Sequence, residues 1–234
     1  MLGVERPLSE EGIRDFDRRV RDFLGLTHCP GYTLEPLVAG VMTELFYEKG
    51  ALSSATLEEG RHRGEEVTRH VKTILTVPLR LSPLDAAMRV PEVLRAWGMV
   101  YMEGRAGASN SMDRVMDTLV QPDLRLTARQ PLNLFCHGVS RLGDLQACLG
   151  VRTHYQMMLA LQGLGLRVNR PHLRVCMEIT ELVDYSFRLK QDISGFPYDI
   201  HGVLITLNPL ERVSQMERTA SSPFWVVAFG FGER

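Results

Sequence analysis

Two adjacent pairs of side chains that could bind a metal are the first candidates for chemistry in this sequence. His28-Cys29 and Cys136-His137 each combine an imidazole with a thiol, and zinc accepts both kinds of ligand. Adjacent residues on a strand point to opposite faces, however, and the chain has neither CxxC nor HxxxH spacing. We therefore predict no metal site and no cofactor. The four cysteines are interpreted as reduced thiols (Cys29, Cys136, Cys148 and Cys176).

Motifs for nucleotide binding and for nucleophilic catalysis are missing from the sequence. No GxxxxGK[ST] P-loop occurs, and Gly163-Leu164-Gly165 lacks both the third glycine and the preceding strand of a dinucleotide fingerprint. No serine stands in a GxSxG context, and no histidine belongs to a nucleophile–base motif. We predict that the protein is not an enzyme and assign no catalytic residue. A triad that only three-dimensional geometry reveals stays open.

Charge is distributed unevenly along the chain, although the formal net charge is -1. Residues 80–174 carry 12 basic and 7 acidic side chains, a net charge of +5, and every basic one is an arginine. Arginine suits contacts with phosphates and carboxylates. We name Arg89, Arg105 and Arg114 as candidate contacts for anionic lipid or another acidic partner, with a solvated surface as the alternative. The glycine- and serine-rich loop over 104–111 could hold an anion or simply connect two elements.

Amphipathic helices are expected in the N-terminal part of the chain. Ser9 can cap a helix whose apolar face contains Phe16 and Phe23 and which Gly25 ends. A second helix is predicted over 34–46, with Leu37 and Leu45 on its apolar face. A polar stretch over 53–66 follows, so we predict an N-terminal helical extension at 1–66.

Alternating patterns dominate the remainder, which we predict to be one core domain at 67–234. Apolar residues of one parity predict strands over 67–81, over 173–189 with a bend near Asp184, over 200–207 and over 224–231. Helices are predicted to begin at Ser82-Pro83, running through Trp97 and Tyr101, and to cover 112–120 and 155–162. The predicted fold class is α+β, with a mostly antiparallel sheet, inserted helices and the N-terminal amphipathic helices before it.

The apolar stretches are short. The longest covers 223–231, about half of what a bilayer-spanning helix needs. The first residues contain no apolar core of a signal peptide. The sequence therefore predicts neither a membrane span nor a cleaved secretory signal.

Two regions resemble the matrix proteins of rhabdoviruses. In the first, HVKTILTVPLRL precedes AWGMVYMEG and then MDRVM, an order similar to that of the vesiculovirus members. In the second, MEIT precedes IHGVLITLNP, which looks like the lyssavirus members. The resemblance covers about residues 70–215. The basic N-terminal arm and the PPxY motif of the family are both missing from this chain.

This resemblance implies a matrix-type structural protein that self-assembles beneath a viral envelope and supports virion assembly and budding. The implied partners are further copies of the chain, the viral nucleoprotein–RNA complex, anionic inner-leaflet lipid and the envelope glycoprotein tail. The implied location is the virion, the host cytoplasm and the cytoplasmic face of host membranes. The alternative is an intracellular α+β interaction or regulatory module without catalytic activity. Apolar candidates for self-assembly are Phe16, Phe23, Leu37, Leu45 and Trp225.

Overall fold

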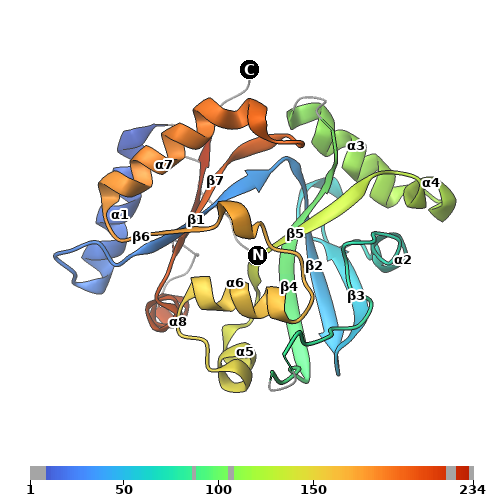
Figure 1. Ribbon diagram of the computed structural model, residues 1–234, viewed down its shortest axis with the longest axis horizontal. Coiled ribbons are helices and arrows are strands. Elements are labelled where there is room, and N and C mark those ends of the chain that lie inside the picture. The colour runs from blue at the N-terminus through green and yellow to red at the C-terminus, as the bar shows by residue number, and fades with distance from the viewer. Residues whose placement is uncertain (1–8, 86–87, 105–107, 220–224, 232–234) are drawn as a thin grey trace.

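Two four-stranded antiparallel sheets carry the fold, and helices cover their outer faces (Figure 1). The computed structural model describes residues 9–85, 88–104, 108–219 and 225–231. The general prediction of an α+β fold built on antiparallel pairing is confirmed, with two sheets in place of one.

The first sheet has the strand order β6-β1-β7-β8, and all neighbours in it are antiparallel. Its strands are β1 (Tyr32–Val38), β6 (Arg174–Cys176), β7 (Ile200–Leu207) and β8 (Val226–Gly230). Every residue of β1 is buried, because one face of the sheet turns toward the second sheet and helices cover the other. The helices on that outer face are α1 (Glu10–Leu24) and α7 (Ile179–Gln191).

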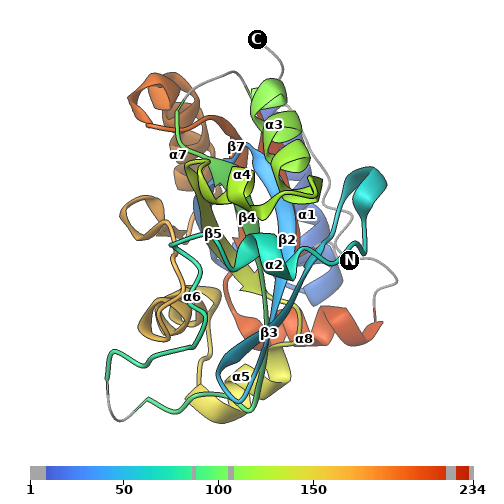
Figure 2. The same ribbon diagram turned by 90° about the vertical axis from the view of Figure 1, so that its right-hand side faces the viewer.

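The second sheet has the strand order β3-β2-β4-β5. Its strands are β2 (Gly40–Glu48), β3 (Ala51–Leu57), β4 (Val93–Met102) and β5 (Leu132–Val139). Its outer face is covered by α2 (Thr68–Val71), α3 (Ala108–Val120) and α4 (Leu124–Ala128). Figures 1 and 2 both show three more helices gathered at one end of the sheets: α5 (Leu142–Leu149), α6 (His154–Gly163) and α8 (Leu210–Thr219). Short 3₁₀ turns occupy Gly60–His62, Arg170–His172 and Asp192–Gly195.

The chain passes directly from one sheet to the other between β1 and β2. β1 lies between β6 and β7, and β2 lies between β3 and β4, so this single crossing supplies an inner strand to each sheet. Gly40 begins β2, where a Cβ atom would stand 2.1 Å from the carbonyl oxygen of Val100. Only glycine lets β2 and β4 approach at this point, which fixes where the two sheets diverge.

Several predicted elements are confirmed. α1 begins after Ser9, whose hydroxyl accepts a hydrogen bond from the amide of Gly12 at 3.2 Å, and it ends at Gly25 with a left-handed φ of 65°. The helices over 112–120 and 155–162 lie within α3 and α6, and the strands over 200–207 and 224–231 correspond to β7 and β8.

Other predicted elements are wrong, for identifiable reasons. The helix over 34–46 is β1 and β2, because strands buried on both faces are apolar at nearly every position and also satisfy a helical spacing. For the same reason, Trp97 and Tyr101 lie on β4 and not on a helix. Residues 67–81 form α2 and irregular turns, and 173–189 divide into the short β6 and α7.

Candidate functional site

A cavity of about 300 Å³ lies between the two sheets, at the lower end of the range for small-molecule sites. We call it the inter-sheet cavity. The second sheet and the segments next to it supply most of one wall, and α6, α8, β7 and β8 close the other. Its lining residues are Met42, Glu44, Glu58, Trp97, Gly138, Val139, Ser140, Leu142, His154, Met157, Thr206, Leu210, Val213, Trp225 and Val226.

Glu44 is the most strongly held charged group of the lining. It shares a face of β2 with Met42, two residues away, so both side chains point into the cavity. One carboxylate oxygen accepts from the guanidinium of Arg95 at 2.8 Å, and the other accepts from the hydroxyl of Ser140 at 2.6 Å. Both oxygens of Glu44 are therefore occupied by neighbours within the chain.

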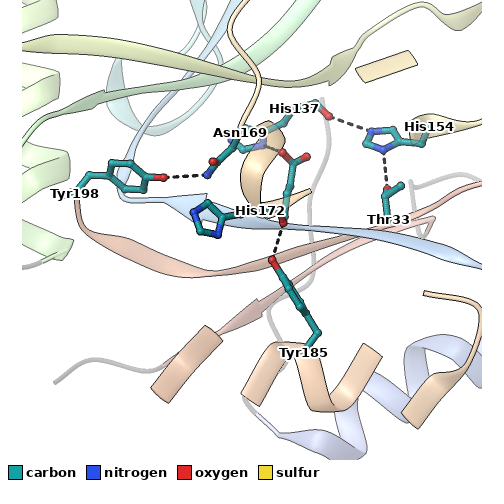
Figure 3. A network of polar contacts seen from close by, with 8 residues as sticks. Thr33, His137, His154, Asn169, His172, Tyr185 and Tyr198 are labelled. Atoms are coloured by element: carbon teal, nitrogen blue, oxygen red, sulfur yellow. Dashed lines mark hydrogen bonds and ion pairs between the residues drawn. The ribbon is translucent and has the colours of Figure 1, made fainter. Parts of the chain in front are cut away.

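His154 forms part of the cavity wall at the start of α6. Thr153 caps that helix by accepting a hydrogen bond from the amide of Gln156, which fixes the position of the following imidazole. The ring nitrogen Nδ1 lies 2.7 Å from the hydroxyl of Thr33, and Nε2 lies 3.1 Å from the carbonyl oxygen of His137 (Figure 3). Both nitrogens of His154 therefore have partners, and neither is free to act as a base or nucleophile.

Burial lowers the pKa of the His154 imidazole from its usual 6.5, against smaller opposing effects of the Glu35 charge and the His137 carbonyl. Because the neutral ring is favoured in the fold, the unfolded chain takes up this proton first as the pH falls. We expect stability to decline below about pH 6.5. In urea titrations, His154→Asn should reduce the slope of unfolding free energy against pH by up to about 1.4 kcal/mol per pH unit. The exposed His28, changed to Asn, is the control for the chemical change itself.

A second buried pair joins the two sheets beside the cavity. Glu35 of β1 and His137 of β5 are 1% and 0% exposed, and their Oε2 and Nδ1 atoms lie 3.0 Å apart. The Trp97 ring packs against His137 with centroids 5.8 Å apart. None of the side-chain oxygens of Glu35 and ring nitrogens of His137 makes a hydrogen bond among the described residues, so their contact is an ion-pair contact alone. Each of these two buried ionisable groups therefore has the other as its ion-pair partner.

Two other polar contacts of the first sheet and its flanking segments are structural. Asn169 donates to the hydroxyl of Tyr198 at 3.0 Å, and the hydroxyl of Tyr185 donates to the carbonyl oxygen of His172 at 2.6 Å (Figure 3). Burial raises the pKa of Tyr185 to about 12, so it stays a neutral hydrogen-bond donor. These pairs fix the segment that precedes β6.

The metal-capable pairs of the sequence do not come together. Across the described ranges, no group of three His, Cys, Asp or Glu side chains is placed to hold an ion. His28 and Cys29 precede β1, whereas Cys136 and His137 lie within β5. Burial raises the pKa of Cys136 to about 12, so its thiol is protonated and unsuited to bind a metal.

The arginines predicted to contact an acidic partner do not form one cluster. Arg89 and Arg114 are both exposed, but Arg89 precedes β4 and Arg114 lies on α3, which follows the opposite end of that strand. Arg105 lies outside the described residues.

The five residues named for self-assembly are also dispersed. Phe16, Leu37 and Leu45 are buried in the chain's own core. Phe23 is 39% exposed on α1, and the partly buried Trp225 lines the inter-sheet cavity. The structure brings none of these side chains into a common surface.

The model of the family "NAD-dependent DNA ligase adenylation domain" matches residues 1–234. The chain belongs to this family. It is 34% identical over 239 residues to a DNA ligase of Halorhodospira halophila, covering 98% of this chain and 33% of that protein. DNA ligases of Marinobacter nauticus (30% over 246 residues, 99% and 35% covered) and Syntrophus aciditrophicus (29% over 245 residues, 99% and 36% covered) are also similar. The chain thus spans about a third of the length of these relatives.

The family match overturns the resemblance to rhabdovirus matrix proteins and the structural role in budding drawn from it. The prediction that the chain is not an enzyme is wrong as well, and so is the non-catalytic alternative, because the family and its relatives are ligases. The predictions that depended on the matrix interpretation are wrong too: the viral partners, the lipid partner and the virion location. No helix in the described part of the chain is long and apolar enough to span a bilayer.

Two glutamates in the sequence indicate a polar site between the sheets. Glu35 and Glu44 interrupt the otherwise apolar run over 32–47, and a carboxylate inside a buried strand needs a partner or a ligand. Interpreting the run as a helix placed these glutamates on its surface. The cavity was missed because its lining comes from elements far apart in the chain.

Proposed function

We propose that the chain is the adenine-recognition domain of a longer DNA ligase-like protein, and that the inter-sheet cavity receives an adenine nucleoside. The observation that carries this proposal is a small-molecule-sized cavity between the two sheets of a chain that belongs to an adenylation-domain family. Family membership alone does not locate a site.

The lining suits a flat purine ring. Trp97 and Trp225 offer aromatic surface, and Met42 and Met157 offer polarisable thioethers. A purine can stack on such side chains, while the Glu58 carboxylate of the lining can accept from its exocyclic amine or from ribose hydroxyls. The mixture of apolar walls and a few polar groups is typical of a ligand site.

DNA is the proposed macromolecular partner of the whole protein, as the names of the relatives state for those proteins. The excess of arginine over 80–174 supports this, because neutralising phosphates supplies most of the affinity for DNA. We keep the exposed Arg89 and Arg114 as proposed phosphate contacts, which titration of charge-reversed variants with nicked duplex DNA would test.

Filling the cavity should abolish nucleoside binding. Met42→Trp puts a large ring into the space, and we expect at least tenfold weaker binding of adenosine in isothermal titration calorimetry. Met177→Trp is the matched control, since Met177 is 57% exposed and lies outside the lining. Equal affinity of both variants and the unmodified chain would place the nucleoside elsewhere.

A further inference from the structure

The charges of the inter-sheet cavity oppose the phosphates of a nucleotide. Among its lining residues the charged ones are two glutamates, Glu44 and Glu58, and neither lysine nor arginine is present. A pyrophosphate needs cations or clustered backbone N–H groups to offset its charge when it leaves water. The lining supplies carboxylates where such cations would be needed.

The cation that contacts the lining glutamate Glu44 is Arg95, and it is already paired. Arg95 binds Glu44 at 2.8 Å, and its guanidinium lies over the Phe46 ring, 4.1 Å from the ring centre. This pairing neutralises Glu44, whereas Glu58 has no ion pair with any cation among the described residues. Glu58 accepts from the hydroxyl of Thr56 at 3.3 Å, a neutral donor that does not cancel its charge. The cavity therefore keeps a negative potential at its second glutamate.

Lysine side chains do not contribute to the cavity lining either. The whole chain contains three lysines, and none of them belongs to the lining. Lys49 forms the turn between β2 and β3 with a φ of 48°, Lys72 follows α2, and Lys190 lies on α7 over the outer face of the first sheet (Figure 1). The lining therefore offers no lysine ammonium group to balance a phosphate or to accept an adenylyl group.

We infer that the inter-sheet cavity selects an uncharged adenine nucleoside and excludes its anionic nucleotides, NAD included. This inference rests on the proposed function and deepens it by naming the ligand's charge. The side chains of this cavity do not fit the pyrophosphate of NAD, because a carboxylate without a cation and a dinucleotide phosphate would repel each other in a partly dry space. The aromatic and thioether walls remain suited to the base.

The test compares adenosine, AMP and NAD with the same chain by isothermal titration calorimetry. We expect AMP and NAD to bind at least tenfold more weakly than adenosine. The remaining AMP affinity should rise with added salt, because salt screens repulsion, whereas a cationic phosphate site shows the opposite trend. Intact mass measured after incubation with NAD should show no added adenylyl group on lysine.

Reversing the unbalanced charge provides the matched variants. Glu58→Lys should raise the affinity for AMP more than tenfold and invert its salt dependence. The control is Glu11→Lys at an exposed position of α1, which makes the same charge change away from the cavity and should leave AMP binding unchanged. AMP or NAD binding as tightly as adenosine, or an adenylyl adduct on lysine, would overturn the inference and leave the proposed function standing. Failure of all three ligands to bind would overturn the proposed function and the inference with it.

Discussion

His137→Ala should destabilise the fold by about 3–5 kcal/mol, because it leaves the Glu35 carboxylate buried without its partner. Glu35 is 1% exposed, its Oε2 lies 3.0 Å from His137 Nδ1, and neither of its oxygens has a hydrogen-bond partner among the described residues. Urea unfolding followed by circular dichroism measures the loss.

A double-mutant cycle separates the pair from simple loss of volume. Glu35→Leu combined with His137→Leu removes both ionisable groups and keeps apolar volume between the sheets. With Glu35→Leu and His137→Leu as the single variants, we expect the double variant to be more stable than His137→Leu alone, since replacing both members of a buried pair costs far less than removing one. Additive losses in the cycle would mean that Glu35 and His137 do not compensate each other.

The pair also explains why the site escaped sequence analysis. Glu35 and His137 are about a hundred positions apart and lie on strands of different sheets. No local spacing connects them, so only the passage of the chain from β1 to β2 and the register of β4 with β5 bring them together. The helices α1, α3 and α6, by contrast, have one buried face each, and their periodicity was sufficient to predict them.

The inner strands are the elements that the sequence patterns predict wrongly. β1 and β4 are buried on both faces, so their apolar runs have no alternation and were assigned to helices. The strand predicted over 173–189 is wrong for a different reason. The buried residues of α7 are Leu182, Val183, Ser186 and Leu189, whereas the alternating pattern that predicted a strand also includes the exposed Val175 and Met177. A parity count cannot distinguish a surface apolar residue from a core one.

Phe16→Ala should cost about 3–5 kcal/mol, because Phe16 attaches α1 to the first sheet. Its side chain is 1% exposed, and its ring packs on that of Tyr32 with centroids 5.5 Å apart. The adjacent Asp17 accepts a hydrogen bond from the Tyr32 hydroxyl at 2.9 Å and pairs with Arg21 at 2.8 Å, so a second contact depends on the same docking.

Phe23 is the matched control on the same helix. It is 39% exposed, and Phe23→Ala should change the unfolding free energy by less than about 1 kcal/mol. Thermal and urea unfolding of the two variants measure the difference. If α1 were instead a surface element that assembles with other copies, both variants would keep full stability and would differ from the unmodified chain in sedimentation velocity. The burial of Ile13, Phe16 and Val20 against the chain's own first sheet and α7 makes the first result the expected one.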